Sequence, residues 1–365
     1  MKKITVLVDI YYLKAAVAGI GSYIREFEAS SSDHGSDDIN YVFSHDINKL
    51  AGNSVFLNSN NRIIRWIFQI RYLIYKQVKL PLKILFSKAD YVICPDYVAP
   101  LITFNAKRIT VLHDSLFWDQ KNNYSVLWRK YFITLINLGM NSKTQIVTTS
   151  NYSKNNLIKI FRNNRNINFV YQSFNFHKTT SSNYKTPENY LLHIGSFEKR
   201  KDLITLVKAF KLVKDDSLKL VLAGAQIING SSEVLNEIKT FIFQNKLENK
   251  VILAGYVSKA EASILYKNAS LYVFPSLDEG FGIPILEALS FSLPVICSDI
   301  DIFKEVGGDC VEYFKVGDSI SLSKKIISVL DSDKLRQNDN TKHINKFSRK
   351  NFIKGFERII LDSND

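Results

Sequence analysis

The chain alternates short apolar, β-branched runs with longer stretches in which apolar residues recur every three or four positions. In the first half, the short runs occupy residues 4–10, 91–94, 108–113 and 145–150. In the second half, they occupy residues 189–196, 218–224, 250–256, 271–276 and 294–299. Helical periodicity fills the intervals, as at 202–213 and 259–269. Strands that alternate with helices predict an α/β fold with doubly wound parallel sheets, covered by helices on both faces.

A polar segment divides the chain into two predicted domains. Residues 173–188 contain few apolar side chains and a proline, which is typical of a linker. A length of 365 residues also suits two cores rather than one. We therefore expect one Rossmann-like domain over 1–175, a linker over 176–188 and a second Rossmann-like domain over 189–345. Because open α/β sheets bind ligands beyond the carboxyl ends of their strands, two such domains facing one another predict a ligand in the cleft between them.

Composition indicates a soluble globular protein, with 46% hydrophobic and 23% charged residues. The three cysteines form no CxxC pair, so neither a disulfide framework nor a zinc site is expected. The N-terminal Met-Lys-Lys and the following apolar run imitate a secretion signal, but Asp9 and Lys14 interrupt it. No apolar run reaches the ~18 residues that span a bilayer. We expect a cytoplasmic protein.

The formal charge of +13 predicts an anionic partner: nucleic acid, phospholipid or a phosphorylated substrate. Residues 62–88 hold seven basic side chains and no acidic one, interleaved with Trp66 and several other apolar residues. This pattern is typical of a basic amphipathic helix on anionic lipid, although an ordinary helix with a solvated basic face would look the same. No nucleic-acid-binding signature accompanies the charge, so we expect no nucleic acid partner. The residues assigned to a membrane or acceptor surface are Arg62, Arg65, Lys76 and Lys79.

The segment EGFGIPILE at 279–287 carries the most specific chemical signal. Glu279 and Glu287 bracket a Gly-Phe-Gly-Ile-Pro turn that leads from an apolar run into a helical one. Such a turn leaves backbone N–H groups at a helix N-terminus, where the dipole favours a phosphate. The carboxylates would accept hydrogen bonds from hydroxyl groups. A ligand with phosphates in the middle and hydroxyl groups at both ends is a sugar nucleotide. The alternative interpretation of the motif is a loop and helix cap in which both glutamates are simply exposed.

Other candidates follow predicted strands. Gly19 and Gly21 open a helix and permit close approach of a ligand, as does any plain turn into a helix. His113 ends the strand at 108–113 and would hydrogen bond to a sugar hydroxyl or an oxyanion, unless it is a satisfied core histidine. Lys199, Arg200 and Lys201 begin a helix, where cations oppose the dipole. An anion bound there would explain them, and so would a solvated cluster.

The motif EGFGIPILEAL resembles the E-x7-E motif of glycosyltransferase family 4, retaining enzymes with the two-domain GT-B fold. The chain is also similar to this family in AGIGSYIREF, VLHD, VTTSNYSKNNL and YLLHIGSFEKRKDLITLVKAF, and the resemblance covers nearly the whole sequence. It is strongest for bacterial mannosyltransferase-like members that build O-antigen and capsule chains. In this family the last helix crosses back onto the N-terminal domain, which suits residues 346–365 and their amphipathic stretch at 348–361.

The resemblance implies specific roles. Glu279 would bind hydroxyl groups of the donor sugar, and Glu287 would bind the ribose of the nucleotide. Lys201 would bind the phosphates. Gly21 would approach the diphosphate, and the backbone of Phe281, Gly282 and Ile283 would contact the sugar and the diphosphate. The base would lie near Tyr256 and Val257. His113 would lie beside the reacting centre. Many members carry an arginine where this chain has Ser196, so we expect Arg200 to supply that second charge.

We therefore expect a retaining hexosyltransferase, with mannose favoured, that uses a GDP-sugar or UDP-sugar without a metal cofactor. The acceptor would be a lipid-linked oligosaccharide of a bacterial surface glycan, reached from the inner face of the cytoplasmic membrane. A nucleotide-sugar epimerase of similar architecture and a non-catalytic, membrane-associated sugar-nucleotide-binding protein are the alternatives. The pair Asp299 and Asp301 resembles a metal-binding DxD, but aspartates are common after strands and no metal is assigned to them.

Overall fold

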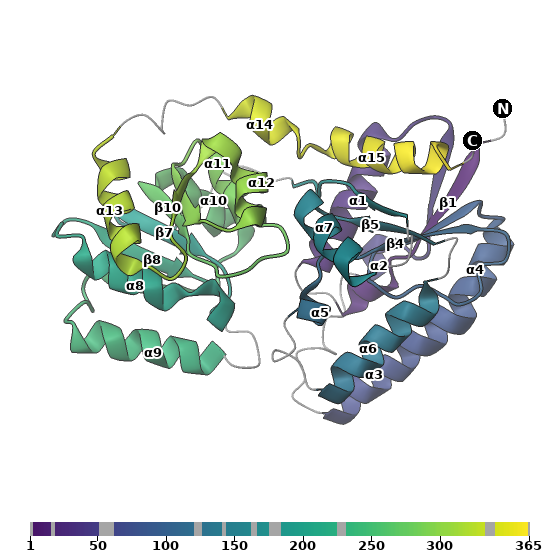
Figure 1. Ribbon diagram of the computed structural model, residues 1–365, viewed down its shortest axis with the longest axis horizontal. Coiled ribbons are helices and arrows are strands. Elements are labelled where there is room, and N and C mark those ends of the chain that lie inside the picture. Colours follow the sequence, from purple (N-terminus) through teal and green to yellow (C-terminus); the bar gives the residue numbers. More distant parts are fainter. Residues whose placement is uncertain are drawn as a thin grey trace. The chain divides into compact units, whose positions relative to one another are not determined.

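The structure is a computed structural model that describes residues 3–15, 19–50, 62–119, 126–140, 144–161, 166–174, 184–224, 231–332 and 340–363. The chain forms two compact units, drawn in Figure 1. Unit 1 comprises Met1–Ser173 and Phe347–Asp365, and unit 2 comprises Phe174–Lys346. Much of the expected linker, residues 176–183, lies outside the described residues.

Unit 1 is built on a six-stranded parallel sheet in the order β2-β1-β3-β4-β5-β6. Its strands are β1 (Ile4–Val8), β2 (Ile39–Phe43), β3 (Tyr91–Cys94), β4 (Lys107–Val111), β5 (Thr144–Thr148) and β6 (Ile167–Phe169). The direction of strand order reverses between β1 and β3, where Val8 pairs with Ile93. That reversal is the switch point at which doubly wound sheets offer a ligand crevice.

Unit 2 repeats this architecture with the order β12-β11-β10-β7-β8-β9, again entirely parallel. Its strands are β7 (Tyr190–Ile194), β8 (Lys219–Ala223), β9 (Val251–Gly255), β10 (Leu271–Phe274), β11 (Val295–Ser298) and β12 (Glu312–Phe314). Strand order reverses between β7 and β10, where Leu191 pairs with Leu271. The switch point of unit 2 therefore lies beyond the ends of β7 and β10.

Helices connect the strands of unit 1. They are the 3-10 turn Tyr11–Lys14, α1 (Ile20–His34), α2 (Ile47–Leu50), α3 (Arg62–Ile74), a π-helical turn (Tyr75–Lys79), α4 (Leu80–Ser87), α5 (Leu116–Asp119), α6 (Val126–Gly139), α7 (Asn151–Ile160) and α15 (Arg349–Leu361). The backbone stays right-handed helical through Ile74 and Leu80, so α3, the π-helical turn and α4 form one continuous helix. Figure 1 shows α6 lying alongside α3 within this unit, and their buried side chains share one apolar cluster.

Helices in unit 2 follow the same alternation. They are the 3-10 turn Lys199–Lys201, α8 (Leu203–Leu212), α9 (Ser231–Gln244), α10 (Lys259–Asn268), α11 (Ile283–Ser290), α12 (Asp301–Gly307), the 3-10 turn Gly308–Cys310, α13 (Ser319–Leu330) and α14 (Thr341–Asn345). Ser258 and Glu261 form a capping box at the start of α10, since each side chain bonds the other's backbone N–H.

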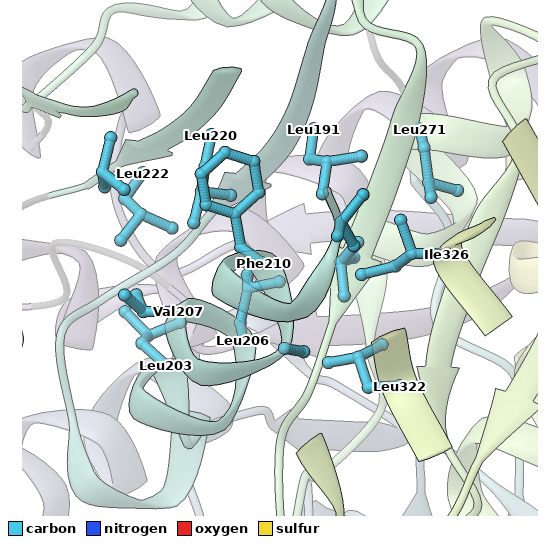
Figure 2. Packing of buried hydrophobic residues seen from close by; sticks show 14 of the residues in the cluster. Leu191, Leu203, Leu206, Val207, Phe210, Leu220, Leu222, Leu271, Leu322 and Ile326 are labelled. Carbon is cyan, nitrogen blue, oxygen red and sulfur yellow. The ribbon is translucent and has the colours of Figure 1, made fainter. Parts of the chain in front are cut away.

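The core of unit 2 forms where α8 and α13 pack on the sheet. The buried residues of α8 include Leu203, Leu206, Val207 and Phe210, at the spacing that places side chains on one helical face. In Figure 2 these side chains lie below the leucines of β7, β8 and β10, with Leu322 and Ile326 of α13 beside them. This packing fixes the strands whose carboxyl ends carry the candidate site.

The last helix, α15, belongs to unit 1 and packs against α1. Its side chains Phe352, Phe356 and Ile360 are fully buried in the core that also contains β1 and β3. Polar contacts also secure it: Tyr91 donates a hydrogen bond to the backbone O of Ile360 at 2.9 Å, and Arg349 forms an ion pair with Glu26. The end of the chain therefore completes the first core.

All nine strands expected from the apolar runs are confirmed, and so is the parallel α/β fold class. The three strands that the pattern missed are β2, β6 and β12, each at an edge of its sheet. Edge strands pair on one side only, and these three carry weaker apolar runs, whereas the edge strand β9 has a strong run and was predicted. No helix among the described residues is both long and apolar enough to cross a membrane.

The assignment of Lys76 to a surface is wrong. Its side chain is fully buried, with Nζ 2.6 Å from Oδ2 of Asp9 and 2.5 Å from Oδ1 of Asp96. Tyr75 and Tyr72 donate hydrogen bonds to the same two carboxylates. Lys76 is buried because these carboxylates stand at the ends of β1 and β3, on the side of the helix that faces the sheet.

Burial alone would lower the pKa of the Lys76 ammonium, but the charges of Asp9 and Asp96 raise it above its usual range, so Lys76 stays charged. Lys79 is exposed, as expected of a surface residue. The side chains of Arg62 and Arg65 lie outside the described part of the chain.

Candidate functional site

The switch point of unit 2 brings together two segments that the sequence analysis selected separately. The loop after β7 ends in the 3-10 turn that carries Arg200 and Lys201, and the loop after β10 carries Glu279. Because β7 and β10 are adjacent and parallel, both loops leave the same edge of the sheet. Leu277 fastens them together, since its N–H donates to the backbone O of Arg200 at 2.7 Å.

Glu279 binds two cations. Nη1 of Arg200 lies 2.8 Å from its Oε2, and Nζ of Lys201 donates to its Oε1. Ser276 also donates to Oε1, at 3.0 Å. Burial alone would raise the pKa of Glu279, but the charges of Lys201 and then Arg200 outweigh it and lower the pKa below its usual value. Glu279 is therefore an ionised hydrogen-bond acceptor rather than a proton donor.

Arg200 is held from its other side by Glu198. Its Nε donates to Oε2 of Glu198 at 2.7 Å, and the Ser196 hydroxyl donates to Oε1 of the same carboxylate at 2.8 Å. Burial opposes the charge on Arg200, but Glu279 and Glu198 raise its pKa and keep it cationic. Ser196, which stands where an arginine was expected, thus helps to orient the carboxylate that orients Arg200. We call Ser196, Glu198, Arg200, Lys201, Ser276 and Glu279 the Glu279 site.

The glycine turn of the 279–287 motif has a conformation that other residues rarely adopt. Gly282 has φ +102° and forms the N-cap of α11, without a side-chain hydrogen bond to cap the helix. A Cβ built at Gly282 would lie 3.0 Å from Cε1 of Phe303, so the position is tight as well as left-handed. Phe281 and Gly282 are buried, and Ile283 is half-buried at the first position of α11 with Pro284 after it. The glycine turn expected from the sequence is therefore present, and its role toward a phosphate stays a prediction.

Glu287 differs from Glu279 in its surroundings. It lies one turn into α11, and the Tyr266 hydroxyl donates to its Oε2 at 2.9 Å. Burial raises the pKa of Glu287 to about 7, although Tyr266 and Lys259 act in the opposite direction. The two glutamates of the motif therefore have different charge states near neutral pH: Glu279 is ionised and Glu287 is partly protonated.

His193, which the sequence analysis passed over, stands in β7 behind the Glu279 site. It is fully buried, its Nδ1 lies 2.9 Å from the backbone O of Val273, and its Nε2 has no hydrogen-bond partner among the described residues. Burial lowers its pKa to about 4, so the ring is neutral and Nδ1 carries the proton. A Cβ at Gly195 would lie 2.9 Å from Nε2, which favours glycine there. The available signal was one histidine inside an apolar strand.

Tyr256 and Val257 follow β9, which lies two strands away from β7. Because the strands are parallel, these residues lie at the same carboxyl end of the sheet as the loop after β7. Tyr256 is 78% exposed and Val257 is half-buried. An exposed aromatic ring at this edge is available to a ligand, while Glu279 and Glu287 occupy the loop and helix after β10. The expected base-binding residues are thus at the carboxyl edge of the sheet, but the structure records no contact between them and the Glu279 site.

In unit 1, His113 follows β4 and is bound on one side. Its Nε2 lies 2.7 Å from the backbone O of Pro95, so Nε2 carries the proton and donates it. Burial lowers the pKa of His113 to about 4, which leaves Nδ1 as an acceptor on a neutral ring. Tyr23 of α1 meets this ring edge-to-face, with centroids 4.7 Å apart. Gly21, also buried in the first turns of α1, lies two residues before that tyrosine.

Asp299 and Asp301, the pair that resembles a metal-binding DxD, lie at the start of α12. Nζ of Lys304 lies 2.6 Å from Oδ1 of Asp299, so the carboxylate of Asp299 is already paired. Asp301 begins α12 as its first residue. Within the described residues, no group of three or more histidine, cysteine or acidic side chains is placed to hold a metal ion.

Comparison with known proteins adds relatives to this geometry. The chain is 32% identical over 183 residues to O-antigen chain mannosyltransferase RfbU of Salmonella typhimurium, covering 50% of each chain. It is 26% identical over 251 residues to O-antigen chain mannosyltransferase B of Escherichia coli, covering 63% of each. The match therefore spans only about half to two thirds of the length of these curated relatives.

Two solved structures share the fold over nearly the full length. A glycosyltransferase from Rickettsia africae has a TM-score of 0.67 at 18% identity, covering 98% of both chains. Anabaena Alr3699/HepE in complex with UDP and glucose has a TM-score of 0.69 at 14% identity, covering 98% of this chain and 100% of its own. At these identities the likeness concerns the fold.

The family model described as "Glycosyl transferases group 1" matches residues 177–345. These residues include the whole Glu279 site and most of unit 2. The match confirms the resemblance on which the site was first assigned. Residues 177–345 of this chain are therefore similar to the glycosyl transferases group 1 family.

Proposed function

We propose that this protein transfers a hexose from a nucleotide diphosphate sugar to a glycan acceptor with retention of anomeric configuration. The observation that carries the proposal is the Glu279 site, in which one ionised carboxylate and two cations converge at the switch point of unit 2. The names of the curated relatives favour mannose as the sugar. The UDP and glucose bound to Alr3699/HepE support a nucleotide-sugar donor.

Lys201 and Arg200 supply charge for the leaving group. The bond between the sugar and the nucleotide diphosphate breaks with negative charge developing on the phosphate, and two preorganised cations stabilise it without reorganisation. Glu279 fixes both cations before the donor arrives, because each oxygen of its carboxylate binds one of them. In the proposed complex the cations turn part of their hydrogen bonding toward the diphosphate.

Glu279 itself is assigned to hydroxyl groups of the donor sugar. Its two cations lower its pKa and withdraw charge, so it is a poor nucleophile and a good anionic acceptor. We therefore propose that the acceptor hydroxyl attacks the anomeric carbon on the face from which the phosphate departs. The new glycosidic bond forms as the bond to the phosphate breaks, and the acceptor's proton passes to a phosphate oxygen.

Other donor contacts remain as proposed from the motif. Glu287 accepts or shares hydrogen bonds with the ribose, and its position one helical turn behind the glycine turn supports this. The backbone of Phe281, Gly282 and Ile283 faces the sugar and diphosphate. Tyr256, exposed at the sheet edge, is assigned with Val257 to the base.

The test is a transfer assay with purified full-length protein, GDP- and UDP-sugars, and a lipid-linked glycan extract. Lys201→Met should reduce turnover by about a hundredfold or more, since one preorganised donor at a developing charge contributes roughly that much. Lys199→Met is the matched control, because Lys199 sits in the same turn but is exposed and pairs with Glu233. Equal loss in both variants, or conversion of the donor to an epimer without acceptor, would contradict the proposal.

We also propose that unit 1 associates peripherally with a membrane. Large apolar side chains of the continuous helix are exposed, many of them by about half or more of their surface: Ile63, Trp66, Ile67, Ile70, Ile74, Val78, Leu82, Leu85 and Phe86. We call these residues the apolar stripe. Arg71 and Lys79 are exposed on the same helix, so apolar insertion and attraction to anionic lipid are available together.

Replacing Trp66 and Phe86 with serine should abolish sedimentation with anionic vesicles and leave nucleotide binding unchanged. Phe243→Ser serves as control, since Phe243 is similarly exposed but lies on α9 of unit 2. Charge reversal at Lys76 would not test this surface, because Lys76 is buried. Unaltered vesicle binding by the double variant would argue against the apolar stripe as the membrane contact.

A further inference from the structure

A second cluster of polar groups lies at the carboxyl ends of β1 and β2 in unit 1. Tyr11 follows β1 and His45 follows β2, and their rings lie 5.5 Å apart. Tyr75, from the π-helical turn, stacks on Tyr11 with centroids 3.9 Å apart and lies 5.2 Å from His45. Three rings from three segments therefore form one platform, in which Tyr11 and His45 are half-buried and Tyr75 is buried. No role was assigned to it from the sequence.

Basic side chains surround this platform. Nζ of Lys83 donates to the backbone O of Ser44 at 2.6 Å, and an ammonium retains further N–H groups after one such bond. Nζ of Lys14 lies 4.6 Å from the centroid of Tyr11. Lys79 and Arg71 are close enough for their charges to act on His45 and Tyr11, respectively.

Asp9 is the carboxylate whose charge acts on both Tyr11 and His45, and this charge is already compensated. Asp9 is buried and bound by Nζ of Lys76 at 2.6 Å. The platform thus combines four cations with a carboxylate that faces inward to its own lysine. Such a local excess of positive charge at the end of a parallel sheet attracts an anionic ligand.

His45 adds an acceptor to these donors. The Ser44 hydroxyl lies 3.0 Å from Oδ1 of Asp9 and 3.0 Å from Nδ1 of His45. Since the serine proton goes to the carboxylate, the stronger acceptor, Nδ1 of His45 carries its own proton and donates to Ser44. The surrounding burial and lysines lower the pKa of His45 to about 4, so the ring is neutral and Nε2 is an acceptor. We call Tyr11, Lys14, His45, Arg71, Lys79 and Lys83 the His45 site.

We propose that the His45 site binds a glycosyl phosphate or diphosphate ester, namely the phosphorylated head of the acceptor, with its phosphate on the lysines and a sugar hydroxyl on Nε2 of His45. The ligand class follows from the N–H donors of the lysines and the hydrogen-bond acceptor Nε2 of His45 together, because a phosphate alone would leave Nε2 unused. This inference rests on the proposed glycosyl transfer, which requires an acceptor besides the donor. Arg71 and Lys79 also belong to the helix with the apolar stripe, so a lipid tail on such a head has an exposed apolar path beside it.

The experiment measures binding of a water-soluble, short-chain alkyl glycosyl diphosphate by calorimetry. It uses full-length protein in a Lys201→Met background, so that the Glu279 site does not compete for the diphosphate. Replacing Lys14 and Lys83 with glutamine should weaken binding by at least about tenfold, the effect of one charge-assisted hydrogen bond. His45→Phe should weaken the glycosyl diphosphate but not the corresponding alkyl diphosphate without a sugar.

Lys159→Gln is the control for charge, since Lys159 is exposed on α7 of the same unit. Absence of binding to the Lys201→Met protein, or equal binding after the Lys14 and Lys83 replacements, would overturn the site. If the Lys14 and Lys83 replacements abolished binding to vesicles of anionic phospholipid but left binding of the soluble probe unchanged, the proposal would also be overturned. The lysines would then bind a lipid surface instead of the acceptor head. Nucleotide binding in an otherwise wild-type chain reports the Glu279 site separately, so failure of either proposal is distinguishable.

Discussion

Nη1 of Arg200 lies 2.8 Å from Oε2 of Glu279, on the carboxylate whose other oxygen accepts from Lys201. The two basic residues are adjacent in sequence, and the glutamate arrives from the other side of the switch point. Glu279 therefore preorganises both charges. That arrangement makes the site dependent on Glu279 for both structure and chemistry.

Glu279→Ala should reduce folding stability as well as transfer. Removing one partner of a buried ion pair leaves an uncompensated charge at a cost of about 3–5 kcal/mol. Here Lys201, which is 7% exposed in the native chain, would be left beside an apolar ring, since its Nζ lies 4.8 Å from the centroid of Phe274. Urea unfolding and calorimetry with a nucleotide sugar measure the two effects. If Lys201→Met restored stability to the alanine variant but not transfer, the two roles of Glu279 would be separated.

Lys76→Met should destabilise unit 1 by about 3–5 kcal/mol, because it leaves the carboxylates of Asp9 and Asp96 buried together without a cation. Lys79→Met, three residues further on and exposed, is the matched control and should change stability little. Thermal or urea unfolding provides the measurement. A neutral effect of Lys76→Met would mean that the two carboxylates find another partner.

Glu287 predicts a pH dependence of stability. Its pKa is raised by burial from 4.5 to about 7 in the folded chain, so folding favours the protonated form. Its contribution is complete below about pH 4.5 and is lost as the pH rises through about 7. Glu287→Gln cannot lose a proton, so its stability relative to wild type should rise between about pH 5 and pH 8, on the order of 1–3 kcal/mol.

The comparison is made by unfolding both proteins at each pH without nucleotide. Tyr266→Phe in the same series tests the hydrogen bond to Oε2 and should raise the pKa of Glu287 further, since Tyr266 stabilises the ionised form. A difference between wild type and Glu287→Gln that stays constant with pH would refute the raised pKa.

Gly282→Ala should impair both the turn and its neighbour. The φ of +102° strains a residue with a side chain, and the new Cβ would meet Phe303 at 3.0 Å. We expect a loss of about 1–3 kcal/mol in stability and weaker donor binding. Gly317→Ala is a control for backbone strain, since Gly317 has φ +72° and a Cβ there would meet nothing within 4 Å. Donor binding that falls equally in both variants would indicate general destabilisation instead.

Phe356→Ala tests the packing of the last helix on unit 1. The ring is fully buried and meets Phe27 of α1 at a centroid distance of 5.0 Å. Its removal should cost about 3–5 kcal/mol through lost burial and the cavity left behind. Phe243→Ala, at an exposed phenylalanine of unit 2, should be nearly neutral. Unfolding monitored by urea, with hydrogen exchange to locate the loss in β1 and β3, distinguishes the variants.

Much of the fold was predictable from local pattern. Central parallel strands are buried on both faces, so β3 and β10 appear as uninterrupted apolar runs and β7 as a run broken only by His193. The carboxyl ends of β7 and β10 locate the loops with Lys201 and Glu279. The edge strand β2 was not predicted because its sequence, INYVF, mixes polar and apolar positions over a half-buried surface. The role of Glu198 was also missed, since a glutamate beside an arginine two residues away is ordinary on any surface.

The sequence by itself determined two α/β units, the glycine turn between Glu279 and Glu287, and a basic helix in the first half. Each of these features depends on which residue types recur at short spacing along the chain, and the sequence shows this by itself. Only the tertiary structure decided which charges meet: Arg200 and Lys201 share Glu279, while Lys76 turns inward to Asp9 and Asp96 instead of facing a membrane. A lysine on an amphipathic helix has the same local pattern in either case. Its burial depends on whether distant strands place carboxylates within reach, because a buried charge is tolerated only with such partners.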